Sequence, residues 1–226
     1  MHSLKTLNEL VLQQESTWLM VQEWVTKATN NVEILPANKQ DASKVLHQLQ
    51  VTTKSFLGVV SYYTGGILVE HGWLRFLGSG SDRLPRSLTS WNGFDSTGKS
   101  PRMQSSILIA DDAVGGFYAM NGSAFEGKPG EIYYLAPDTL EWESLDMQYS
   151  DFLKWAFLGD VRKYYESFQW DNWVEDVSRL DGDKGILIYP FLWAEGKASA
   201  NRTRAIVPIE ELWNVNMVNR ENLGIQ

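Results

Sequence analysis

Few residues in this sequence are of the types that perform covalent or metal chemistry. The chain has no cysteine and three histidines, His2, His47 and His71, none of which has a second ligand at metal-binding spacing. Thiolate nucleophiles, cysteine-ligated zinc and iron–sulfur clusters are therefore excluded, and a histidine metal site is not expected. His71 lies in a predicted turn, where a solvent-facing histidine is the simplest interpretation. We expect a protein that is not an enzyme and that uses no cofactor and no metal ion.

Three short motifs resemble parts of known sites without completing them. Gly78–Ser81 lacks the Lys-Ser/Thr ending of a phosphate loop, and no helical pattern follows it. Asp181–Asp183 starts like a calcium loop, but Leu192 stands where a bidentate glutamate is required. Asp111 and Asp112 do not form a catalytic pair, because successive residues of a strand point to opposite faces. One of them is expected to cap the turn into residues 114–116.

Tryptophan is the unusual feature of the composition, with ten residues. Most are expected in the core, but Trp91 lies in a polar stretch and Trp142 lies among acidic residues, so these two are predicted at the surface. An aromatic ring with polar neighbours can serve as a protein-binding hot spot or a sugar platform, or it can cover a sheet edge. Glu141 and Glu143 flank Trp142 and form either a solvated face or a patch that attracts a basic partner.

A second group of residues suggests a different function. Arginine pairs grip carboxylate or phosphate groups, and tryptophan supplies a stacking face. A small-ligand binder or an enzyme could therefore use the glycine-, serine- and arginine-rich stretch 78–106 as a lid over the sheet. That stretch shows no periodicity, so it is either a functional loop or contains a short element that the pattern does not reveal. The residues of this group are Arg83, Arg86, Trp91, Asn92 and His71.

The pattern of elements indicates an α+β protein with a central, mostly antiparallel sheet flanked by helices, because strands and helices do not alternate strictly. A capping box at Thr6 and Glu9 opens a helix whose apolar stripe continues to Val25. Residues 32–36 form a link. Gly159 should end a helix in the left-handed conformation. The further helices are expected at 39–50, 54–63, 152–158, 160–168, 172–180 and 209–218, and the strands at 67–69, 73–77, 107–110, 116–120, 131–135 and 186–193.

Length and charge limit the classes of function. The 226 residues fit one domain, 1–226, with a sizeable core, because no repeat or linker divides them. The 20 basic and 28 acidic residues give a net charge of −8, which argues against nucleic acid as a partner. The N-terminal segment lacks the features of a signal peptide, and no apolar run is long enough to span a membrane. The expected location is the cytoplasm.

Several segments of the chain resemble the SUKH superfamily of Smi/Knr-like and Syd-related proteins, and more specifically a bacterial branch known only as a domain of unknown function. The shared pattern consists of a helix and glycine turn, an apolar strand that ends in an acidic turn, a Gly-led strand and a Ser/Phe/Leu helix. The segments are 55–67, 107–121, 130–138 and 149–156 for the superfamily, and 72–80 and 134–143 for the branch.

The resemblance implies a SUKH-like core at about 53–158, preceded by a helical segment at 1–52 and followed by an extension at 159–226. It also implies a fold that is usually without enzymatic activity. Many bacterial members are immunity proteins that neutralise a toxin, often a nuclease. We therefore expect a non-catalytic, protein-binding domain whose partner is a basic toxin protein, because an acidic surface can occlude a nucleic-acid-binding cleft by mimicking phosphates. Nothing in the sequence predicts the oligomeric state.

Overall fold

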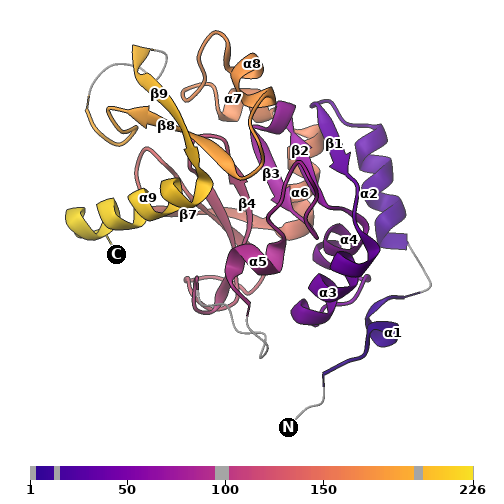
Figure 1. Cartoon of the computed structure of the whole chain (residues 1–226). Coiled ribbons are helices and arrows are strands. Elements are labelled where there is room, and N and C mark those ends of the chain that lie inside the picture. The colour runs from indigo at the N-terminus through magenta and orange to yellow at the C-terminus, as the bar shows by residue number, and fades with distance from the viewer. Residues whose placement is uncertain (1–3, 13–15, 95–101, 196–200, 226) are drawn as a thin grey trace.

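A seven-stranded antiparallel sheet forms the centre of the molecule. The computed structural model describes residues 4–12, 16–94, 102–195 and 201–225. Each strand pairs with its neighbour in the sequence, so the sheet is a meander in the order β1 to β7. Figure 1 labels β1 to β4 and β7 of this sheet. The strands are β1 (Val32–Leu35), β2 (Gly66–Val69), β3 (Leu74–Leu77), β4 (Ser106–Asp112), β5 (Phe117–Asn121), β6 (Glu131–Leu135) and β7 (Trp142–Gln148). The predicted α+β class and antiparallel sheet are confirmed.

One face of the sheet carries a layer of helices: α2 (Ser16–Thr26), α3 (Lys39–Leu49), α4 (Phe56–Tyr63), α6 (Tyr149–Leu158) and α7 (Val161–Tyr164). Capping explains where several of them begin, because Asn38, Ser55 and Asp160 each accept a backbone N–H of the first turn. Stacked rings join α2 to α4, with Trp18 and Tyr63 centred 5.1 Å apart. Phe152 of α6 packs on Phe76 of β3 at 5.0 Å.

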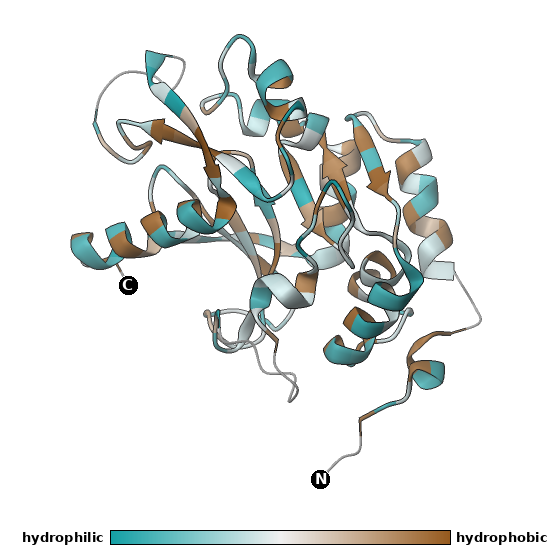
Figure 2. Cartoon of the chain, in the orientation of Figure 1, coloured by the Kyte–Doolittle hydropathy of each residue, from teal (hydrophilic) through white to brown (hydrophobic). Residues whose placement is uncertain are grey.

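The opposite face is covered by smaller elements that include a β-hairpin. The elements are α5 (Leu88–Asn92), the antiparallel pair β8 (Lys184–Tyr189) and β9 (Thr203–Pro208), and α9 (Ile209–Leu223). Trp213 of α9 meets Phe117 of β5 edge to face at 5.0 Å. Hydrophobic and hydrophilic residues are interspersed along α9 (Figure 2), as expected of a helix with one face on the sheet. The sheet therefore lies between two layers.

Tryptophan builds much of the core, as predicted. Trp73, which follows the 3-10 turn Glu70–Gly72, is fully buried. Its ring lies 5.6 Å from Tyr165, 5.8 Å from Trp170 and 5.2 Å from Trp173, measured between centroids. Trp173 begins α8 (Trp173–Ser178), so this aromatic cluster fastens the segment after α7 to the sheet.

Several predicted elements differ from the structure. The segment 32–36, expected as a link, contains edge strand β1, and strands β7 and β9 were not predicted. The first helix is two helices, α1 (Leu7–Leu10) and α2, because the chain is extended at Val11. Gly159 follows α6 with φ −88° and ψ 179°, so the expected left-handed ending is wrong. The strand predicted at 186–193 ends at Tyr189.

Candidate functional site

Asp111 and Asp112 lie at the end of β4 and point into different layers, as strand alternation predicts. Asp111 shares a face with Arg75 and Phe117, its partners on the two neighbouring strands. Asp112 lies on the opposite face of the sheet, where its carboxylate meets Tyr134. Both carboxylates are completely buried. They therefore form two separate polar sites instead of one catalytic pair.

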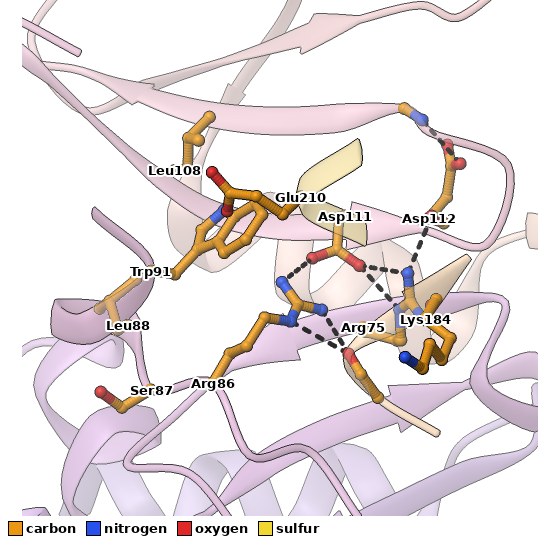
Figure 3. A network of polar contacts seen from close by, with 12 residues as sticks. Arg75, Arg86, Ser87, Leu88, Trp91, Leu108, Asp111, Asp112, Lys184 and Glu210 are labelled. Atoms are coloured by element: carbon orange, nitrogen blue, oxygen red, sulfur yellow. Dashed lines mark hydrogen bonds and ion pairs between the residues drawn. The ribbon is translucent and has the colours of Figure 1, made fainter. Parts of the chain in front are cut away.

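Asp111 binds two arginines from different segments (Figure 3). Arg75 Nε donates to Asp111 Oδ1 at 2.7 Å, and Arg86 Nη1 donates to Oδ2 at 2.6 Å. The guanidinium groups also donate to the carbonyls of Lys184, at 2.6 Å, and Gly182, at 2.7 Å. Burial lowers the pKa of Arg75, and Asp111 opposes this shift. This buried network joins β3, β4, the 78–106 stretch and the start of β8, so its role is structural.

Trp91 is not at the surface, which corrects the prediction for this residue. Its side chain belongs to the short helix α5 and only 5% of the residue is exposed. The guanidinium carbons of Arg86 and Arg102 lie 4.6 and 4.1 Å from its ring centroid, and the ring stacks on Phe117. A guanidinium group can lie over an indole ring because the negative face of the ring attracts the cation. The ring is therefore part of the core.

The stretch 78–106 contains one short helix, α5, which the sequence pattern did not reveal. Ser87 caps α5 by accepting the N–H of Ser90 at 3.0 Å. The Asn92 carboxamide then joins this helix to β4, because it accepts the N–H of Leu108 and donates to the carbonyl of the same residue, both at 2.8 Å. Residues 95–101 of the predicted lid lie outside the described residues. The described part is fastened to the sheet by buried hydrogen bonds.

Asp112 occupies a buried site among tyrosines. Its Oδ1 accepts the N–H groups of Val114 and Gly116, at 3.0 and 2.8 Å, so it caps the turn as expected. Tyr134 donates to Oδ2 at 2.7 Å, and the ring of Tyr118 stacks on that of Tyr134. Burial raises the pKa of Asp112 to about 6, against the effect of these hydrogen bonds.

A perturbed acid in a cleft would indicate catalysis. Four of the best-formed cavities among the described residues have other linings, and Asp112 borders none of these four. A Cβ at position 116 would lie 2.0 Å from Asp112 Oδ2, so glycine is required there for the carboxylate to fit against the turn. The site therefore stabilises the turn between β4 and β5.

An open aromatic groove lies where β7 begins, close to the C-terminal end of α9. Its volume is about 800 Å³. Phe125 stacks on Tyr133 with ring centroids 4.2 Å apart and meets Trp142 at 5.1 Å. Glu126 and Glu141, both exposed, are the two acidic residues of the lining, and the charge of Glu141 acts on Arg220. We call the three aromatic and two acidic residues the Trp142 groove: a surface of aromatic rings with an acidic rim.

Arg220 of α9 closes one side of the Trp142 groove. Its guanidinium donates to the carbonyl of Leu140, in the turn before β7. Burial lowers the pKa of Arg220, while the nearby Glu141 opposes the shift. This arginine therefore holds α9 against the turn.

The remaining predicted site residues are distributed over the molecule. Glu143 pairs with Tyr134 across β6 and β7, so it lies on the face opposite Trp142. Arg83 forms an ion pair of 2.5 Å with Glu33 of β1, at the other edge of the sheet. His71 lies near the ring of Trp173, with centroids 6.3 Å apart. Of the predicted residues, Trp142 and Glu141 line the Trp142 groove together.

Among the described residues, no group of three or more His, Cys, Asp or Glu side chains could hold a metal ion. None of the described helices is both long enough and apolar enough to span a bilayer.

Comparison with known proteins identifies relatives over nearly the whole chain. The family model described as "Protein of unknown function DUF2625" matches residues 7–212. The chain is 41% identical to an uncharacterised Escherichia coli (strain K12) protein, YbfG, over 96% of this chain and 98% of the relative. It is 35% identical to an uncharacterised Haemophilus influenzae protein over 98% of each chain. No solved structure matches significantly.

Proposed function

Because the chain belongs to the family of unknown function DUF2625, whose description names no activity, we propose a function from its own surface: a non-catalytic domain that binds a basic protein. More specifically, we propose an immunity-type protein that neutralises a bacterial toxin. The resemblance of residues 53–158 to the SUKH superfamily supports this choice, since many bacterial members are immunity proteins.

The Trp142 groove is the observation that carries the proposal. Its aromatic rings offer apolar area that a partner can bury, and tryptophan and tyrosine are enriched among residues that dominate binding energy. Two exposed acidic residues, Glu126 and Glu141, line the same groove as the rings. A lysine or arginine side chain can lie on an aromatic face while its charge pairs with a carboxylate, which gives affinity and selects a basic partner.

The charge of the whole chain supports the same partner. The net charge of −8 produces a field that attracts a basic protein and accelerates its association. A nuclease toxin has a basic cleft for the phosphates of its substrate, so an acidic binding protein can occupy that cleft in their place.

A toxin-neutralisation assay tests the proposal. Candidate toxins are the products of genes adjacent to the gene for this chain, expressed in a sensitive bacterium with or without the protein. We expect wild-type protein to restore growth and Trp142→Ala to lose protection, while the control Arg83→Ala, at the other edge of the sheet, protects fully. If neither neutralisation nor a complex at micromolar concentration is found for any candidate, the immunity proposal fails.

A second candidate function is small-ligand binding beneath the 78–106 stretch. It is favoured by a cavity of about 840 Å³ between the start of α3 and this stretch. Ser79, Ser81, Ser87 and Ser90 line it together with Asp41. Ligand-observed NMR with a fragment library tests this alternative: fragments that bind wild-type protein should lose binding in Ser87→Trp, whose indole would fill the cavity.

A further inference from the structure

Strand β7 is one edge of the seven-stranded sheet, and no strand of the described residues lies on its outer side. It pairs only with β6 in the strand order. Among the described residues, its backbone makes no hydrogen bond to the backbone of any element on its outer side. Edge strands of this kind can accept an added strand from another chain.

The register shows which residues of β7 direct their backbone outward. The N–H of Ala136 donates to the carbonyl of Glu141 at 3.2 Å, so Glu141 bonds toward β6. In an antiparallel pair this direction alternates along the strand. The N–H and C=O groups of Trp142 and Ser144 therefore point away from β6. Asp146, with φ +52°, interrupts the regular strand, so the accessible edge is short.

The side chains along this edge determine what it can accept. Trp142 and Ser144 lie on the same face of β7 as the Trp142 groove. Their partners on β6 are Leu135 and Tyr133, which are two residues apart and so share one face of that strand. Glu141, Glu143 and Asp146 are all exposed. A second copy of this chain, pairing edge to edge, would place these carboxylates beside one another, which is unfavourable. A basic strand meets them with opposite charge.

We propose that β7 binds an extended, basic segment of the partner protein as an eighth strand. Backbone hydrogen bonds form at Trp142 and Ser144, and an arginine or lysine side chain of the added strand lies on the Trp142 ring, near Glu141 and Glu126. This inference rests on the proposed function and adds its binding mode. The edge supplies affinity that is independent of partner sequence, and the groove with its acidic rim supplies selectivity.

Synthetic peptides test the proposal with the full chain. The probe is a capped eight-residue peptide that alternates arginine with threonine or valine, and binding is followed by titration calorimetry and by amide NMR shifts. In an added strand only alternate peptide N–H groups face β7. N-methylation of that alternate set should therefore weaken binding at least tenfold, while N-methylation of the other set should change it less than twofold. Equal tolerance of both sets, or no binding at all, overturns strand addition.

A matched pair of protein variants tests the same edge from the other side. Ser144→Pro removes the outward N–H without removing a hydrogen bond to β6, and proline is accepted on edge strands. Ser144→Ala is the control, because it loses the same hydroxyl and keeps the N–H. We expect peptide affinity to fall at least fivefold in Ser144→Pro and to stay within twofold in Ser144→Ala, at equal melting temperatures. Equal affinity in the two variants overturns the proposal, and the peptide series decides if Ser144→Pro does not fold.

The two proposals fail in different ways. If Trp142→Ala abolishes toxin neutralisation or peptide binding while N-methylation and Ser144→Pro have no effect, the groove binds side chains and strand addition is wrong. If the peptides bind by strand addition but no toxin is neutralised, the edge is a binding site and the immunity function is wrong. Sedimentation that shows self-association lost in Ser144→Pro would make a second copy the occupant and overturn the choice of a basic partner.

Discussion

Asp112 is a buried acid whose charge changes near neutral pH. Its pKa is raised to about 6, chiefly by burial, from 3.8. At pH values between 3.8 and about 6, Asp112 is therefore protonated in the folded chain and ionised in the unfolded chain. The contribution of this group to stability is therefore complete below about pH 4 and is lost as the pH rises through 6. A shift of this size corresponds to about 3 kcal/mol.

Asp112→Asn should remove this pH dependence. The amide cannot ionise, and its oxygen still accepts the N–H groups of Val114 and Gly116. Urea unfolding at about pH 4.5 and 7.5 should show wild-type stability falling relative to the variant, by about 3 kcal/mol at most. Exposed Asp138→Asn is the control and should follow wild type. If the stability of Asp112→Asn and of wild type changed with pH in parallel, the pH dependence would not come from Asp112.

Arg86 and Arg83 are three residues apart and differ in environment. Arg86 is buried, and its loss leaves the Asp111 carboxylate with Arg75 alone. Breaking a buried pair costs about 3–5 kcal/mol. Arg83 and Glu33 are about half exposed, and such a pair contributes at most about 1 kcal/mol. Chemical denaturation should rank Arg86→Ala far below Arg83→Ala in stability. Similar losses for both variants would show that the Asp111 network is not structural.

At the scale of elements, the hydrogen bonds of Asn92 hold α5 against β4. Asn92→Ala leaves the buried N–H and C=O of Leu108 without their side-chain partner, at a cost of about 1–3 kcal/mol for each unsatisfied group. Hydrogen–deuterium exchange should accelerate at residues 86–94 in this variant. Asn92→Asp would place a carboxylate oxygen against the carbonyls of Leu88 and Leu108 at a fully buried position, so it should lose at least as much stability as Asn92→Ala. Unchanged exchange would contradict the proposed fastening role.

The sequence predicted those helices and strands that depend on neighbouring residues, such as a capping residue or an apolar run. Helix α3 was predicted at 39–50 and spans Lys39–Leu49, because Asn38 caps it, and β6 has its predicted bounds. The strands β1, β7 and β9 were missed because their residues are partly exposed and polar, so they lack the continuous apolar run of a central strand. Their pairing depends on distant chain segments, which spacing alone does not show.

In the candidate site, too, the features that depend on adjacent residues were predicted, and those that depend on distant segments were not. Strand alternation correctly separated Asp111 from Asp112, since it depends only on adjacent residues. The position of Trp91 was wrong, because the polar residues around it in the sequence include the arginine that packs on its ring. Trp142 and Glu141 do line one groove, but Phe125, Tyr133 and Arg220 were not foreseen. They arrive from β6, the turn before it and α9, which only the fold brings together.

At the scale of the whole molecule, the two layers leave different parts of the sheet exposed. The helical layer and the α5–hairpin–α9 layer bury the central strands, whereas β7 remains partly exposed at its edge. The acidic residues of β7 protect this edge from pairing with a copy of itself. The same charges attract a basic chain, so one feature of the surface opposes self-association and favours the proposed partner.

The charge distribution makes salt dependence the clearest test at this scale. Exposed charges are screened beyond about 10 Å at 0.1 M salt and more strongly above it. Raising sodium chloride from about 50 to 500 mM should weaken the arginine peptide about tenfold, mainly through slower association. Glu141→Gln should weaken binding at low salt and reduce the salt dependence, whereas exposed Glu166→Gln, on a separate segment after α7, should leave the dependence near that of wild type. Equal salt dependence in Glu141→Gln and wild type would mean that the acidic rim does not contribute to recognition, and the aromatic rings alone would then have to account for binding.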